Sequence, residues 1–259
     1  MSDDVLLVEE RGRIRLLTLN RPQVRNALNL ALNDALVEAL VDADHDPSVY
    51  AVAITGAGAA FCSGADLADA RALADAGRPW YGPLHSTRRS LFEAMIDTRK
   101  PTVAVVNGPA VAGGFELALS CDLRVVAESA FFAVPEAKRG RGAHFASVAL
   151  PGLVPQGIAM EWLYTGRRIP VAEAERFGLV NRVAPDDAVL DVALELLEDV
   201  VSSAPLSLQR LKLTYRRTQG MPPHEAIRLD IGPDVYASED QKEGARAFLE
   251  KREPRWQGR

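Results

Sequence analysis

The stretch Thr102-Val-Ala-Val-Val-Asn-Gly-Pro-Ala-Val-Ala-Gly-Gly-Phe-Glu-Leu-Ala-Leu-Ser-Cys121 passes from one apolar run through a glycine-containing turn into another. The first run, Thr102–Val106, has the length and the β-branched residues of a buried strand. The second begins near Gly113 or Gly114 and has the character of an apolar helix. Unpaired amides at a helix start, together with the helix dipole, favour negative charge. The stretch therefore predicts a strand-to-helix turn whose backbone can stabilise a developing anion.

A second loop of this kind, Thr55-Gly-Ala-Gly-Ala-Ala-Phe-Cys-Ser-Gly-Ala-Asp-Leu67, also follows an apolar run. Its small residues let a ligand approach the backbone closely. Glycine-rich turns are common, so neither loop identifies a reaction by itself. Neither loop matches the GxxxxGK[ST] phosphate loop or the GxGxxG dinucleotide motif, and phosphoryl transfer and hydride transfer are therefore not favoured.

Around these loops, strand-like runs alternate with helical segments, which predicts an α/β fold. The strand-like runs are Val5–Val8, Ile14–Leu19, Tyr50–Thr55, Thr102–Val106, Leu123–Ala127 and Phe131–Val134. Residues 28–43 repeat apolar side chains at helical spacing. After about residue 156 strand signals almost vanish, and we expect helices at Val189–Val201, Leu206–Arg217, Pro223–Leu229 and Glu239–Lys251. Residues 70–98 carry several Gly and Pro and are expected to cross the surface as a candidate lid or pocket wall.

The composition is that of an ordinary globular protein: 259 residues, 47% hydrophobic and 25% charged. A net charge of -5 supplies no general positive field for nucleic acid, so we expect no nucleic-acid partner. The two cysteines, Cys62 and Cys121, do not form a metal-ligand pattern and are expected to be small buried residues. The acidic N-terminus lacks an export signal, and no apolar run approaches the roughly 20 residues of a membrane span. These features predict a cytoplasmic protein without a membrane partner.

Two glutamates stand out beside the predicted turns. Glu116 lies about one turn inside the apolar helix, where it either complements the helix dipole or serves chemistry. Glu136 follows a strand-like run and Pro135, and it is either an exposed loop carboxylate near Lys138 and Arg139 or part of a site. Both interpretations stay open at this level.

Several segments together resemble the enoyl-CoA hydratase (crotonase) family, in the family's order and spacing over nearly the whole chain. The matching segments are Asn20–Asn29, Ala60–Leu67, Gly113–Leu119, Phe132–Lys138, Ser238–Gly244 and Phe248–Pro254. The resemblance implies a crotonase-like spiral of ββα units over residues 1–195. It also implies a helical C-terminal region, residues 196–259, that forms a homotrimer or a homohexamer built as a dimer of trimers.

The resemblance further implies an acyl-CoA thioester substrate, with coenzyme A as part of the substrate and no separate cofactor or metal. The amides of Ala65 and Gly113 would form an oxyanion hole. Glu116 and Glu136 would exchange protons with water and with the substrate α-carbon. The residues that would contact the substrate or its CoA are Arg25, Ala27, Ser63, Gly64, Asp66, Leu67, Gly114, His144 and Lys251.

The expected reaction is reversible addition of water to a trans-2-enoyl-CoA, which gives a 3-hydroxyacyl-CoA of fatty-acid breakdown (β-oxidation). His144 and Phe145 lie where small residues are usual in the family. This difference leaves the acyl specificity and the reaction itself open. His144 is a structural residue, a polar pocket residue or a second proton carrier. Arg25 and Lys251, the latter acting across a subunit interface, are either CoA-phosphate contacts or surface charges. Trp80 and Tyr81 either line the acyl pocket or act as packing anchors.

Three alternatives remain beside hydration. An enoyl-CoA isomerase can work with one carboxylate at the position of Glu136. A hydratase or dehydratase for an unusual acyl group, such as carnitinyl-CoA, would use the same framework. A non-catalytic acyl-CoA-binding protein would bind the thioester without converting it.

Overall fold

The computed structural model describes residues 4–77 and 89–259. Strands lie at β1 Leu6–Arg11, β2 Ile14–Leu19, β3 Ala51–Gly56, β4 Thr102–Val106, β5 Ala110–Val111, β6 Leu123–Ala127, β7 Phe131–Ala133, β8 Arg168–Pro170 and β9 Arg182–Ala184. Helices lie at α1 Leu30–His45, α2 Leu67–Asp75, α3 Leu91–Asp97, α4 Gly113–Ser120, α5 His144–Leu153, α6 Gln156–Thr165, α7 Val171–Arg176, α8 Val189–Val201, α9 Pro205–Arg217, α10 Pro223–Ala226 and α11 Glu239–Glu250. Short 3-10 helices occur at η1 Pro22–Val24 and η2 Glu136–Arg139.

Two sheets organise the described part of the chain. The larger has the order β1-β2-β3-β4-β6-β9, with an antiparallel β1–β2 pair and parallel pairing elsewhere. The smaller has the order β5-β7-β8. Strands β4 to β7 alternate between the sheets, since β4 and β6 belong to the larger and β5 and β7 to the smaller. Each such strand pair is followed by helical structure, which confirms the predicted spiral of ββα units.

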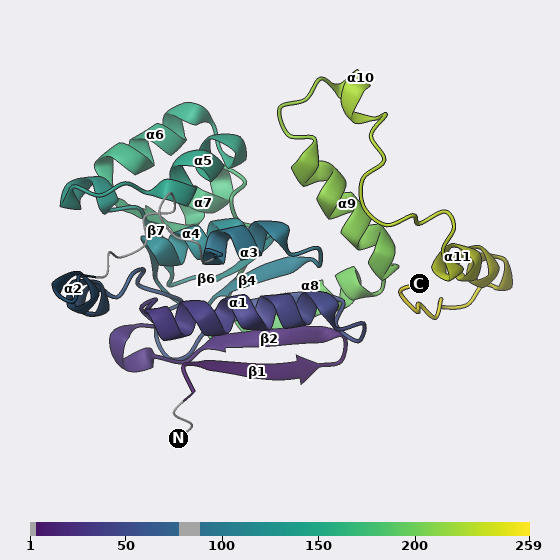
Figure 1. Ribbon diagram of the computed structural model, residues 1–259, viewed down its shortest axis with the longest axis horizontal. Helices are drawn as coiled ribbons and strands as arrows, with labels where there is room; N and C mark the ends of the chain where they lie inside the picture. The colour runs from purple at the N-terminus through teal and green to yellow at the C-terminus, as the bar shows by residue number, and fades with distance from the viewer. Residues whose placement is uncertain (1–3, 78–88) are drawn as a thin grey trace.

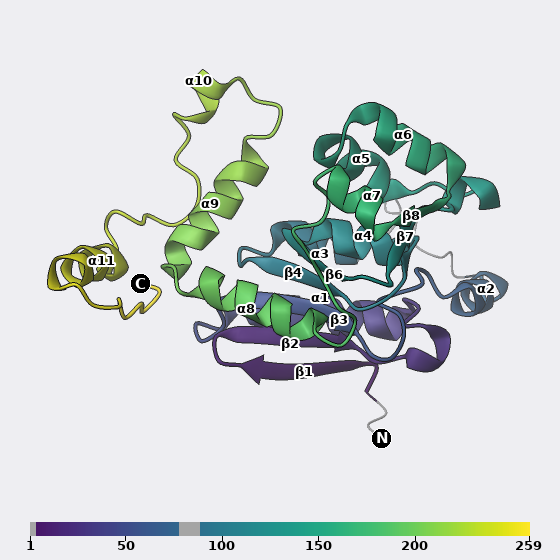
Figure 2. The ribbon, with the colours of Figure 1, turned by 180° about the vertical axis from the view of Figure 1, so that it is seen from behind.

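Helices cover both faces of the larger sheet. Helix α1 lies on one face in Figure 1 and α8 on the other in Figure 2. Each presents one apolar stripe to the core, formed in α1 by Leu32, Leu36, Leu40 and Ala43. Helix α1 begins at Leu30, later than its apolar period suggests, because the Asn29 side chain accepts the Leu32 amide and caps the helix. Burial of these stripes is the main force that fixes the helices on the sheet.

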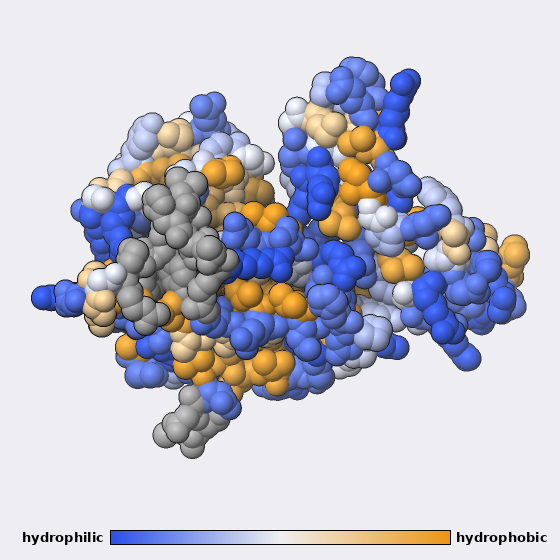
Figure 3. Space-filling view, in the orientation of Figure 1, coloured by the Kyte–Doolittle hydropathy of each residue, from blue (hydrophilic) through white to orange (hydrophobic). Residues whose placement is uncertain are grey.

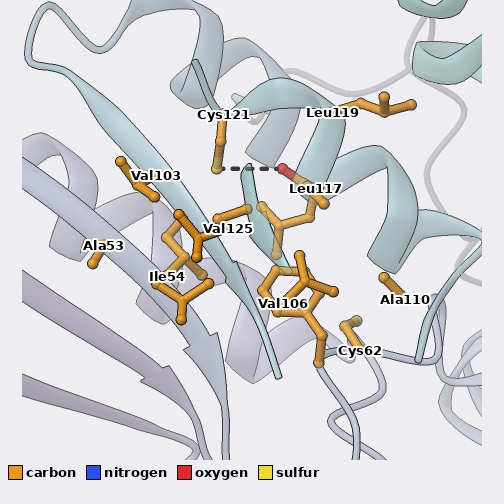
Figure 4. Packing of buried hydrophobic residues seen from close by; sticks show 14 of the residues in the cluster. Ala53, Ile54, Cys62, Val103, Val106, Ala110, Leu117, Leu119, Cys121 and Val125 are labelled. Carbon is orange, nitrogen blue, oxygen red and sulfur yellow. Dashed lines mark hydrogen bonds between the residues drawn. The ribbon is translucent and has the colours of Figure 1, made fainter. Parts of the chain in front are cut away.

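Both cysteines are buried in the core, as predicted, and Figure 4 shows them among apolar side chains of β3, β4, β6 and α4. Burial raises the pKa of both thiols to about 12, so they are protonated at neutral pH. The Cys121 thiol lies 3.6 Å from the Leu117 carbonyl oxygen. They therefore pack as small apolar residues.

Two predictions of secondary structure differ from the fold. Strands β8 and β9 occur after residue 156, where we expected helices, because three-residue strands are too short to show an alternating pattern. Helix α10 ends at Ala226 rather than Leu229. Helix α8 continues through residue 195 to Val201, and the division of the chain at 195 stays a prediction. Trp80 and Tyr81, and with them part of the predicted lid, lie outside the described residues.

The last three helices project beyond the two sheets, and α9 contacts the spiral through Lys212 and Arg216. Both ribbon views show α9, α10 and α11 extending away from the spiral (Figures 1 and 2). The described residues include no helix that is both long and apolar enough to cross a bilayer.

Candidate active site

The two glycine-containing loops meet at the start of α4. The Val111 amide donates to the Cys62 carbonyl at 2.9 Å, and the Leu28 amide donates to the Gly64 carbonyl at 2.8 Å. The loop that follows β3 therefore lies between residues 25–28 and the turn before α4. Close packing requires glycine here, since a Cβ on Gly64 would lie 2.7 Å from the Ala112 Cβ. Gly64 also has φ +89°, which favours glycine.

This arrangement brings the amides of Ala65 and Gly113 next to each other. A Cβ on Gly113 would lie 3.7 Å from the Ala65 nitrogen, and one on Gly64 would lie 3.0 Å from the Gly113 nitrogen. Within residues 4–77 and 89–259, neither amide donates a hydrogen bond. Two free amides that converge at a helix N-terminus are suited to bind an oxyanion.

The turn before α4 has a strained backbone at Ala112, the residue before the Gly113 amide. Ala112 has φ 54° and ψ -129°, a conformation that non-glycine residues rarely adopt. Its amide donates to the Ala133 carbonyl at 2.9 Å, and its carbonyl accepts the Glu116 amide at 3.0 Å. These two hydrogen bonds hold Ala112 in place at the start of α4.

The parallel pairing of β5 with β7 explains how two distant glutamates reach one edge of the smaller sheet. Ala110 pairs with Phe132 and Val111 with Ala133. Parallel strands end at the same edge, so the segments that follow β5 and β7 start side by side. The first segment carries Glu116 and the second carries Glu136. The two carboxyl groups interact there, since the charge of Glu116 raises the pKa of Glu136.

Glu116 is buried, with 6% of its surface exposed. Its Oε1 accepts the Ala146 amide at 2.9 Å, and the Phe145 amide also donates to the carboxylate. Burial raises its pKa, while the two amides and the neighbouring His144 oppose that rise. The first turn of α5 thus holds the Glu116 carboxylate, and its amides favour the ionised form against the effect of burial.

Glu136 differs from Glu116 in its hydrogen bonding. Its Oε2 is buried and has no hydrogen-bond partner among the described residues. Burial raises its pKa to about 7; its own amide, Arg139 and Arg141 oppose the rise, and Glu116 adds to it. At neutral pH this carboxyl is therefore present in both protonation states. The pair can supply one ionised and one protonated carboxyl group.

Most of the other predicted site residues lie around this centre. Ala27 is buried beside Leu28, and the Ser63 amide donates to the Arg25 carbonyl at 3.0 Å. Gly114 packs tightly, since a Cβ there would lie 2.1 Å from the Cys62 carbonyl oxygen. Arg25 itself is exposed. The predicted segment from residue 25 to 28 and the predicted loop therefore form one surface next to the free amides.

Three predicted residues have other positions or tasks. The Asp66 carboxylate caps α2 by accepting the Ala68 amide and forms an ion pair with Arg21 at 3.0 Å. Leu67, the first residue of α2, is 52% exposed. His144 is the exposed first residue of α5.

Lys251 is not brought to the site within one chain. It ends α11, which lies apart from α4 in both ribbon views. A role for Lys251 in CoA binding would need a second subunit.

Sequence reasoning missed two features of the site. It did not anticipate the Phe145 and Ala146 amides that hold Glu116, because backbone amides carry no sequence signal. It also missed the buried Asn26, whose side-chain amide donates to the carbonyls of Ala57, Ala60 and Phe61 at 2.9, 2.8 and 3.2 Å. The available signal was its place directly before the apolar pair Ala27-Leu28. No group of side chains suited to hold a metal ion occurs in the described chain.

Comparison with known proteins gives one consistent family. The family described as enoyl-CoA hydratase/isomerase matches residues 9–259. The chain is 40% identical to the enoyl-CoA hydratase EchA19 of Mycobacterium tuberculosis, over 98% of this chain and 96% of that protein. It is 42% identical to a carnitinyl-CoA dehydratase of Citrobacter koseri, over 96% of each.

Solved structures agree with the sequence relatives. A crystal structure of enoyl-CoA hydratase from Mycobacterium tuberculosis superposes with a TM-score of 0.89 at 36% identity, covering 99% of this chain and 100% of that one. A probable enoyl-CoA hydratase/isomerase from Mycobacterium abscessus gives a TM-score of 0.87 at 38% identity, with both chains covered completely.

Proposed function

The chain belongs to the enoyl-CoA hydratase/isomerase family, and on that premise we propose that it adds water reversibly to a trans-2-enoyl-CoA to give a 3-hydroxyacyl-CoA. The observation that carries the proposal is the pair of dissimilar carboxyl groups, Glu116 and Glu136, beside two free amides. An acid, a base and an oxyanion site are the groups that this reaction needs.

The amides of Ala65 and Gly113 would bind the thioester oxygen. When water adds to the β-carbon, the electrons of the double bond move towards the thioester and the oxygen becomes an enolate. Donors directed at this oxygen stabilise the charge only as it develops, and loss of one such donor costs about 2.7–4 kcal/mol of barrier. The proximity of the two amides supports this role.

The two glutamates would then divide the proton transfers. Glu116, which accepts the amides of α5, takes a proton from the attacking water. Glu136, with its unpaired buried oxygen and a pKa of about 7, delivers a proton to the α-carbon of the enolate. Dehydration reverses both transfers. A pKa near the working pH suits a group that must both hold and release a proton.

Loss of absorbance of the conjugated thioester tests the reaction directly. We expect the protein to hydrate crotonyl-CoA or longer trans-2-enoyl-CoAs, and we expect Glu116→Gln and Glu136→Gln to lower kcat by about 10²–10⁴-fold. Circular dichroism controls for folding. Near-normal rates in both variants would exclude the assignment of the glutamates, and no turnover of any enoyl-CoA by the native chain would exclude hydration.

Dehydration of a carnitinyl-type thioester is a second candidate, because relatives at 41–42% identity carry the name carnitinyl-CoA dehydratase. The proposed groups would serve both reactions, and the acyl substituent would distinguish them. A parallel assay with carnitinyl-CoA, followed by mass spectrometry of the product, separates the two. Isomerisation of a 3-enoyl-CoA would instead survive Glu116→Gln, since it needs one carboxylate.

We further propose that the protein forms a homotrimer or a dimer of trimers through its C-terminal helices. Exposed apolar side chains collect there, and Figure 3 shows hydrophobic surface along α9. They are Leu211, Tyr215, Ile227, Tyr236, Phe248 and Leu249, each 61–83% exposed. Apolar patches of this kind commonly mark protein interfaces. Mass measurement by light scattering tests the proposal, and a monomer at micromolar concentration would exclude it.

A further inference from the structure

Helix α9 makes several polar contacts with the spiral. Its only buried residues are Pro205 at its start and Lys212 in its middle. Apolar side chains on the same helix point outward, with Leu211 68% and Tyr215 61% exposed. Because α9 buries a lysine while it exposes Leu211 and Tyr215, the partners of that lysine help to orient the helix.

Those partners form a cluster, here called the Asp122 triad, of Asp122, Lys212 and Arg216. The Asp122 carboxylate accepts Lys212 Nζ at 2.7 Å and Arg216 Nη2 at 2.9 Å. It also accepts the amide and hydroxyl of Thr102 at 2.8 and 2.9 Å. Lys212 Nζ donates in addition to the Lys100 carbonyl at 2.6 Å. All three side chains are mostly buried, Lys212 with only 6% exposed.

Arg216 extends the triad to the C-terminal ends of α3 and of α4, the helix that carries Glu116. Its Nη1 donates to the carbonyls of Met95 and Ile96 at 2.9 and 2.6 Å, in the last turn of α3. Its Nη2 lies 3.3 Å from the carbonyl of Ser120, the last residue of α4. A cation at a helix C-terminus satisfies carbonyls that lack partners and complements the helix dipole.

Helix α4 is short, so a contact at its end acts close to its start. It has eight residues, and Ser120 follows Glu116 by four, which is about one turn. The same helix begins at Gly113, whose amide converges with that of Ala65. Both ends of α4 are thus held, by Ala112 at the start and by Asp122 and Arg216 at the end.

We propose that the Asp122 triad positions α4, so that the C-terminal region sets the alignment of Glu116 and of the Gly113 amide. Asp122, Lys212 and Arg216 are positioning residues in this scheme and contact no substrate. The proposal rests on the hydratase function proposed above. Buried ion pairs suit such a task because their geometry is specific, and loss of one partner leaves a buried charge unpaired.

The test compares Arg216→Ala and Arg216→Lys with Arg210→Ala as the matched control. Arg210 lies on the same helix and pairs with Asp230, but Asp230 is 87% exposed. We expect Arg216→Ala to lower kcat for enoyl-CoA hydration on the order of ten- to a hundredfold, because small misplacements of catalytic groups have large effects on rate. KM should change less than about threefold, since the loops around Ala65 are untouched. Arg216→Lys should recover part of kcat, and Arg210→Ala should match the native protein.

Hydrogen exchange measured by mass spectrometry separates this role from simple support of the fold. We expect faster exchange in Arg216→Ala within both residues 113–120 and residues 205–217. Faster exchange in 205–217 alone, with kcat unchanged, would overturn the proposal. If Arg216→Ala does not fold, Lys212→Met is measured in the same way, and unchanged kcat and exchange at 113–120 would again overturn it. If the native protein hydrates no enoyl-CoA, the hydratase function fails, while exchange at 113–120 still decides whether the triad holds α4.

Discussion

Replacement of Glu136 by Gln should stabilise the folded protein at neutral and alkaline pH while it removes activity. Burial raises the pKa of Glu136 from the ordinary 4.5 to about 7. Between these values the folded chain keeps a proton that the unfolded chain has released. The free energy of unfolding therefore falls as pH rises through this window, and it stays lowered above pH 7. Below pH 4.5 both states are protonated, and Glu136 has no such effect.

The size of this effect follows from the two pKa values. A rise from 4.5 to about 7 corresponds to about 3 kcal/mol for a fully enclosed group. Glu136 is only partly buried, so solvent screening reduces the expected gain in Glu136→Gln to about 1–2 kcal/mol at pH 8. The substitution removes no hydrogen bond at Oε2, because that atom has no partner.

Urea unfolding followed by circular dichroism at pH 4, 6 and 8 measures the effect. We expect the native protein and Glu136→Gln to be equally stable near pH 4 and to diverge as pH rises. Glu243→Gln serves as a control in which the free energy of unfolding should change with pH in the opposite direction. Glu243 accepts Arg252 and the Arg255 amide, which lower its pKa to about 2, so its stabilising effect is present above about pH 4.5 and is lost as pH falls through 2. A gain in Glu136→Gln that is equal at all three pH values, or a loss at pH 8, would refute the reasoning.

Three further substitutions test the packing and the ligand contacts of the loops. Gly114→Ala would place a Cβ 2.1 Å from the Cys62 carbonyl oxygen, so α4 must shift. We expect the free energy of unfolding, measured with urea, to fall by about 1–3 kcal/mol. An unchanged unfolding midpoint would contradict this close approach. Asn26→Ala leaves buried carbonyls without donors, so we expect the free energy of unfolding to fall by at least about 2 kcal/mol. A fall of less than about 1 kcal/mol would show that water replaces the side chain. Arg25→Ala should weaken CoA binding about two- to fivefold in calorimetry without altering the circular dichroism spectrum, whereas an unchanged Kd would make Arg25 a surface charge.

Sequence was sufficient where the signal is local. The run Thr102–Val106 predicted a strand and Gly113 a helix start because apolar period and glycine placement act over a few residues. The same holds for α1, apart from its first turn. The order of the matching segments was also enough for the resemblance to the family that the comparisons show.

Only the tertiary structure decided how these parts combine. Glu116 and Glu136 meet because β5, two residues long, pairs with β7, and a strand of that length has no readable period. The tertiary structure buries both carboxyl groups and gives them different hydrogen-bond partners. Their pKa values therefore depend on contacts between segments far apart in the chain. Lys212 shows the limit most clearly: its sequence context is that of an exposed helical lysine, and its burial is explained by Asp122, 90 residues earlier, and by the Lys100 carbonyl.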